Sequence, residues 1–99
     1  MTILGNKIKQ PVEELDYDIS YKDFLTDSDE LNTSLTPNVV ITPDKPGGLV
    51  KGIVTITEDR VKVWLKSGIS GDQYKIEVTV KTNEGRIRQD EFYINVQEF

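Results

Sequence analysis

The sequence contains no histidine and no cysteine. Without histidine, the chain lacks the side chain that most readily exchanges protons near neutral pH, which is also the commonest metal ligand. Without cysteine, it cannot form disulfides, thiolate zinc sites or iron–sulfur centres, and it has no thiol nucleophile. These absences remove most routes to enzymatic chemistry. We therefore expect a protein that is not an enzyme and that needs no cofactor.

Aromatic residues and long apolar runs are also scarce. The 99 residues include 3 Phe, 4 Tyr and 1 Trp, and 36% of the chain is hydrophobic. A chain of this length buries one core, which should be thin and built from Val, Ile and Leu. No stretch is long enough for the apolar core of a signal peptide or for a membrane span. The net charge of −5 argues against nucleic acid as a partner, because phosphate binding needs a basic surface.

The clearest pattern in the chain is a strict alternation of apolar and polar residues from Gln73 to Thr82. A period of two indicates a strand with one buried and one solvated face, as in an antiparallel sandwich or barrel. The strand follows Gly71 and Asp72, a turn that places Tyr74 near its start. This arrangement is typical of the tyrosine corner of immunoglobulin-like sandwiches, in which the phenol bonds to nearby backbone.

Further strand signals recur along the chain, separated by short polar turns. With no helical period anywhere, they predict an all-β fold, an immunoglobulin-like antiparallel sandwich of about seven strands, with a small barrel as the alternative. Residues 1–14 have no sustained period, so we expect an extended N-terminal arm, followed by a sandwich domain at 15–99. The predicted strands lie at about 15–22, 31–35, 39–41, 49–57, 61–66, 73–82 and 87–96.

Trp64 is the first candidate for contact with a partner. It shares its phase with Lys62 and Lys66, so simple alternation points it away from the buried side of its strand. An outward tryptophan is a candidate anchor for a partner protein or a sugar. The alternative is that both faces of the strand are covered, or that a bulge shifts the phase.

Basic residues gather on the predicted outward faces of the later strands, whereas the first thirty residues are acidic. Arg86 and Arg88 extend the basic set that includes Lys62 and Lys66. Segregated charge of this kind can help copies of one protein stack, or dock a partner of opposite charge. The alternative is an ordinary solvated surface of alternating charge.

Acidic residues in the first third of the chain are candidate Ca²⁺ ligands, since hard cations bind several carboxylate oxygens. Their spacing lacks the order of a known calcium loop, and Asp is also a common turn residue. Both interpretations stay open for Asp16, Asp18, Asp27, Asp29 and Glu30.

Several segments together resemble a known family. In order and spacing, they are similar to the small fiber-tail adaptor proteins of tailed bacteriophages, and the resemblance extends from Lys9 to Val96. The most specific part is Val63-Trp64-Leu65 with Gly68, followed by Gly71 and Tyr74. The other segments are Lys9-Gln10-Pro11, Asp16-Tyr17-Asp18-Ile19, Asp29-Glu30-Leu31, Gly85-Arg86, Asp90-Glu91-Phe92 and Val96.

The resemblance implies an immunoglobulin-like virion protein of the neck or upper tail, made in the host cytoplasm. Its partners would be the tail tube or connector and the tail fibers, with neither nucleic acid nor membrane involved. Several copies would form a homo-oligomeric ring. A separate hypothesis, motivated by the lack of a period in residues 1–14, is that this arm docks on a neighbouring subunit. Two alternatives remain: a capsid decoration protein, and a carbohydrate- or cell-surface-binding module that uses Trp64 or Tyr93 as its platform.

Overall fold

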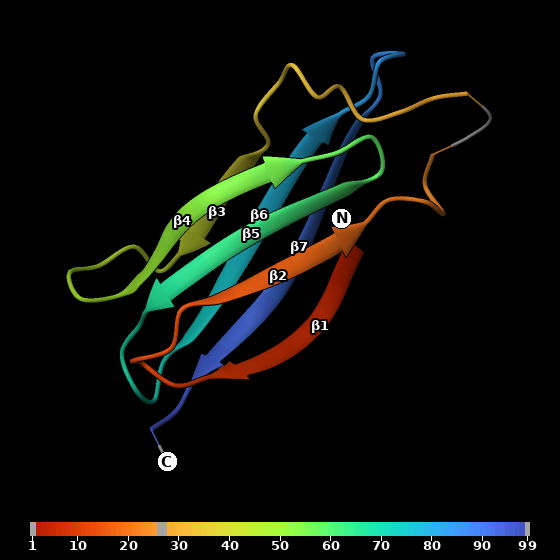
Figure 1. Ribbon diagram of the computed structural model, residues 1–99. Coiled ribbons are helices and arrows are strands. Elements are labelled where there is room, and N and C mark those ends of the chain that lie inside the picture. Colours follow the sequence, from red (N-terminus) through yellow and green to blue (C-terminus); the bar gives the residue numbers. More distant parts are fainter. Residues whose placement is uncertain (1, 26–27, 99) are drawn as a thin grey trace.

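Seven strands form two packed sheets in the computed structural model, which describes residues 2–25 and 28–98 (Figure 1). This confirms the predicted all-β sandwich. Within those residues there is no helix, and so none that could cross a membrane. Sheet A has the order β1-β7-β6-β3, and sheet B has the order β2-β5-β4. The strands are β1 (Thr2–Lys9), β2 (Leu15–Ser20), β3 (Asn38–Thr42), β4 (Leu49–Ile56), β5 (Arg60–Ser67), β6 (Gln73–Lys81) and β7 (Ile87–Val96).

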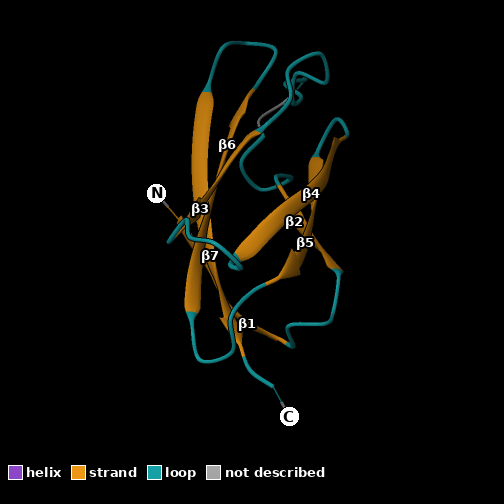
Figure 2. Ribbon diagram, turned by 90° about the vertical axis from the view of Figure 1, so that its left-hand side faces the viewer, coloured by secondary structure: helices purple, strands orange, loops and turns teal. Residues whose placement is uncertain are grey.

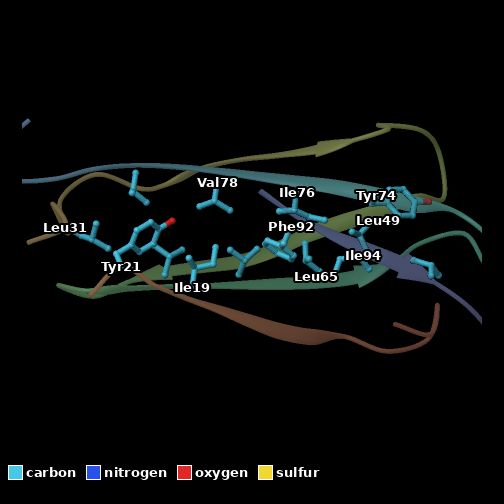
Figure 3. Close-up of a cluster of buried hydrophobic side chains, with 14 residues drawn as sticks. Ile19, Tyr21, Leu31, Leu49, Leu65, Tyr74, Ile76, Val78, Phe92 and Ile94 are labelled. Carbon is cyan, nitrogen blue, oxygen red and sulfur yellow. The ribbon is translucent and has the colours of Figure 1, made fainter. Parts of the chain in front are cut away.

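The core lies between the sheets, which Figure 2 shows as two separate layers. Alternating residues of the strands form this core. In β6, every second residue from Tyr74 to Val80 is buried, and the intervening residues are more exposed. Each fully buried Val, Leu or Ile contributes about 1.5–3 kcal/mol of apolar burial. Tyr21 and Leu31 fill one end of this core and Tyr74 the other (Figure 3).

Two regions differ from the predicted strands. The segment from Leu31 to Leu35 is not a strand: Leu31 makes an isolated bridge to Thr82, and the Leu35 N–H closes a turn by bonding to the Asn32 carbonyl at 3.1 Å. The structure has a different strand in its place: β1, at the start of the chain, brings the number of strands in the described residues to seven and pairs in parallel with β7. Residues 2–9 are therefore part of sheet A and not an arm that precedes the sandwich.

The strand β1 has no readable period because its register shifts between Ile3 and Asn6. Gly5 lies in this irregular stretch with φ 116°, a conformation that favours glycine. At the end of β1, the Lys9 ammonium is buried and donates to the carbonyls of Gln10 at 2.8 Å and Ser67 at 2.6 Å. Burial lowers the pKa of Lys9, and its bonds tie β1 to the end of β5.

The predicted tyrosine corner is present at the start of β6. The buried Tyr74 hydroxyl accepts the Ile69 N–H and donates to the Asp72 carboxylate, each at 3.1 Å. Asp72 also forms an ion pair, at 2.7 Å, with Lys45, which lies in the loop between β3 and β4. Asp72 therefore connects the tyrosine corner in the β5–β6 loop to the β3–β4 loop.

Candidate interaction surfaces

Trp64 lies on the outer face of sheet B, in the central strand β5. The neighbouring Val63 and Leu65 are fully buried, whereas Trp64 is half-buried. The alternation in β5 is therefore unbroken, as the simple sequence pattern predicts. The irregularity lies in the adjacent β4, where the register shifts between Lys51 and Val54.

The tryptophan sits between a carboxylate and a glycine. Asp16 is its cross-strand partner in β2. On the other side, a Cβ added to Gly52 would lie 3.2 Å from the Trp64 Cβ and 3.9 Å from a Glu14 carboxylate oxygen. A side chain at position 52 would therefore crowd the base of the indole. Glycine keeps this flank of the tryptophan open.

Apolar and charged side chains surround this position. Val50, opposite Lys66, is 44% exposed, and the bulged Ile53 is 69% exposed. Lys62 pairs with Asp16 at 3.5 Å, and both side chains are about two-fifths exposed, so the pair contributes about 0–1 kcal/mol to stability. We call this surface the Trp64 face; it consists of Asp16, Val50, Ile53, Lys62, Trp64 and Lys66.

Arg86 and Arg88 do not belong to the Trp64 face, because they lie by the β6–β7 turn and in β7 of sheet A. Their guanidinium carbons stack over the Phe24 ring at 4.4 and 4.9 Å from its centroid, a favourable cation–π arrangement. Arg86 donates twice to Asp29 Oδ2, at 3.0 and 3.1 Å. Arg88 Nε donates to Asp90 Oδ1 at 3.0 Å. The cross-strand partner of Arg88 is the buried Val80, so Arg88 lies on the inner side of β7, and its predicted outward placement is wrong.

Both carboxylates in these pairs are buried, and Asp29 has no exposed side-chain surface. Burial by itself would raise the pKa of Asp29. Hydrogen bonds from Thr82, Arg86 and the backbone of Glu84 and Glu30 outweigh that effect and leave the pKa lowered. Asp29 is therefore held as a carboxylate, and Arg86 is its counter-ion.

The acidic residues weighed as Ca²⁺ ligands are dispersed. Asp16 pairs with Lys62 and Asp29 with Arg86, while Asp27 lies outside the described residues. In the part of the chain that the structure describes, no group of three or more acidic side chains is arranged to hold a metal ion.

Sequence reasoning missed the connection between Phe24 and the two arginines. The signal was weak, since Arg86 and its carboxylate partner are 57 residues apart and nothing in the local pattern links them. It also missed a groove beside β2, lined by residues of three strands, because that groove depends on the position of β1.

Comparison with known proteins identifies a family whose model matches most of this chain. The family model described as podophage GP4 fiber-tail adaptor protein gp77 matches residues 9–95. The matched span includes the whole Trp64 face and both arginine pairs. No curated protein matches the chain.

Proposed function

Because this chain belongs to the podophage fiber-tail adaptor family, we propose that it is a non-enzymatic neck protein that links the tail tube or connector to the tail fibers. The observation that carries the proposal is the family match over residues 9–95. The sandwich suits this role, because a rigid double sheet holds its outer faces and strand edges at fixed separations. An adaptor needs such fixed surfaces more than it needs a cleft.

In this proposal, the Trp64 face binds one of the phage partners. A half-buried tryptophan is held in place by its neighbours yet leaves part of the indole free to contact a second protein. Tryptophan at the centre of a contact, flanked by apolar side chains, is typical of the residues that dominate binding energy. Lys62, Lys66 and Asp16 then lie at the rim, where they set orientation and association rate.

The remaining predicted contacts are assigned differently. Arg86 and Arg88 pair with buried carboxylates, which favours a role within the chain over contact with a partner. Several copies arranged as a ring would meet side to side. The outer edges of β1, β3 and β4 suit such contacts, because they are unpaired among the described residues.

Immunogold electron microscopy of phage particles tests the location. Antibody to the purified protein should label the neck, at the junction with the fibers. Label spread over the shell would identify a capsid decoration protein instead. If the particles carry no label, the protein is better explained as a free binding module. A glycan array would then test whether it binds carbohydrate.

A binding measurement tests the Trp64 face. Trp64→Ala should weaken association with the connector or fiber protein at least about tenfold, because the anchor of the contact is lost. Ile87→Ala is the matched control, since it removes a 68% exposed apolar side chain from sheet A. Circular dichroism must show that both variants are folded. Equal affinity of the two variants for the partner would contradict this assignment.

A further inference from the structure

The two sheets are unequal, and the difference leaves a gap at one margin. Sheet A has four strands and sheet B three. Tyr17 of β2 packs against Phe92 of β7, with ring centroids 5.7 Å apart, so β2 faces β7 and not β1. At the other margin β3 and β4 are in contact. Among the described residues, sheet B therefore has no strand beside β2, in the position that would face β1.

A groove occupies this position and has a volume of about 380 Å³. Apolar side chains from β2 and β7 form much of its lining, and Lys7 lines its β1 side, in the row that faces the core. Figure 1 shows β1 curving away from β2 at this margin. We call this groove the β2 groove. It is lined by Lys7, Asp16, Tyr17, Asp18, Ile19 and Phe92.

A buried polar atom at the β2 groove has no partner. The Tyr17 hydroxyl is inaccessible to solvent and makes no hydrogen bond to any residue that the structure describes. Burial and the nearby carboxylates of Glu13 and Asp16 raise the pKa of Tyr17, so the phenol keeps its proton and remains a donor. Buried hydroxyls are seldom left unbonded, because the loss of solvation is not compensated. If the Tyr17 side chain turns toward the β2 groove when a segment binds, a backbone carbonyl of that segment would accept this hydrogen bond.

The backbone of β2 offers further hydrogen-bonding groups. Residues Leu15–Ser20 pair with β5 on one side, and no described strand pairs with the other. The N–H and C=O groups along that edge are available to an added strand, as in β-augmentation. Cross-strand pairing with Trp64 and Lys62 places Asp16 and Asp18 on the outer face of sheet B, and both are exposed.

We propose that the β2 groove binds an extended segment of a partner protein in which apolar residues alternate with lysine or arginine. The segment adds a fourth strand to sheet B. Its apolar side chains point inward onto Phe92 and Tyr17, where Lys7 disfavours a second cation. Its basic side chains point outward, beside Asp16 and Asp18, because side chains of a strand alternate between faces.

Charge favours this occupant over the same edge of a second copy. Symmetric pairing of two β2 strands would bring Asp16 and Asp18 close to their own counterparts, and like charges across a strand pair are destabilising. The net charge of −5 disfavours acidic segments in the same way. The inference goes beyond the adaptor role, since it concerns the open edge of β2, which adjoins the Trp64 face at Asp16, and names the chemistry of what binds there.

Peptide binding to the full chain, followed by NMR of the backbone amides, tests the proposal. The probe is a synthetic peptide of about eight residues that alternates valine and lysine, the length of an ordinary strand. A control peptide has the same composition with the two residues in separate blocks. We expect shifts at Leu15–Ser20 and Phe92, and an affinity about tenfold higher for the alternating peptide.

Three variants sharpen the test. Tyr17→Phe keeps the ring and should weaken binding roughly threefold by removing one hydrogen bond, without destabilising the free chain. Asp18→Asn should weaken binding to a similar extent. Asp44→Asn is the matched control, because it removes the same charge from an exposed position in the loop between β3 and β4. It should leave the affinity unchanged.

Two sets of results would overturn the proposal. Equal binding of the two peptides, or equal losses in Asp18→Asn and Asp44→Asn, would mean that net charge alone attracts the peptide. Shifts at Leu15–Ser20 that depend on protein concentration in the absence of peptide would assign the edge to a second copy of this chain. Either result leaves the adaptor role untouched, because particle labelling tests that role separately.

Discussion

Lys62 and Arg86 have similar exposure but opposite structural settings. Their side chains are 41% and 36% exposed, and each forms an ion pair. The Asp16 partner of Lys62 is 40% exposed, whereas the Asp29 partner of Arg86 is completely buried. The burial of the carboxylate, more than that of the cation, decides what the pair contributes to stability. The Lys62–Asp16 pair can therefore be lost at little cost, whereas loss of Arg86 would leave a buried charge without its counter-ion.

The largest effect should come from removing the counter-ion of the buried carboxylate. Arg86→Ala leaves Asp29 without its cation and removes the stacking on Phe24. We expect the Tm to fall on the order of 10 °C, because an uncompensated buried charge is strongly destabilising. Thermal unfolding followed by circular dichroism measures it. An unchanged Tm would show that water reaches Asp29.

A smaller loss should follow when the charge is kept but its geometry is changed. Arg86→Lys retains the cation, yet an ammonium on a shorter stem cannot reproduce both donors to Asp29 and the planar stacking on Phe24. The Tm should fall by about half as much as in Arg86→Ala. Full recovery of stability in the lysine variant would mean that charge alone is required.

The pH dependence of stability should report on the buried carboxylate of Asp29. The folded pKa of Asp29 lies below its ordinary value of 3.8, so its contribution is present at neutral pH and is lost as the pH falls through the folded pKa. The stability gap between the original chain and Asp29→Asn should therefore shrink below about pH 4. Urea unfolding at a series of pH values measures this gap. A gap that stays constant down to pH 2 would contradict the assignment.

The smallest effect is expected at the exposed pair. Lys62→Ala breaks a contact between two solvated groups, so the Tm should change by no more than about 4 °C. Thermal unfolding under the conditions used for Arg86→Ala gives the direct comparison. A loss as large as that of Arg86→Ala would remove the distinction between the two surfaces.

Period-two patterning predicted the central strands well, because β5 and β6 each bury one face between two sheets. It also predicted the outward direction of Trp64. The pattern failed for β1, whose irregular register around Gly5 hides the alternation, and for Leu31–Leu35, where polar turn residues surround one buried leucine. Edge and turn segments pack against fewer neighbouring residues, so their sequences are less constrained.

The partners of Arg86 could not be predicted for a different reason. Alternation states which side of a strand a residue occupies, but it does not state what lies against that side. Asp29 and Phe24 approach Arg86 from a loop far away in the sequence. The β2 groove was equally hidden, because it arises from the unequal number of strands in the two sheets.

The most direct test of the Trp64 face uses the fact that the chain contains one tryptophan. The protein can be prepared with 5-fluorotryptophan, so that a single ¹⁹F NMR signal reports on position 64, and mixed with unlabelled connector or fiber protein. If the Trp64 face carries the adaptor contact, the signal should shift and broaden as the complex forms. If size-exclusion chromatography detects the complex while the ¹⁹F signal stays unchanged, the assignment of the adaptor contact to the Trp64 face is contradicted.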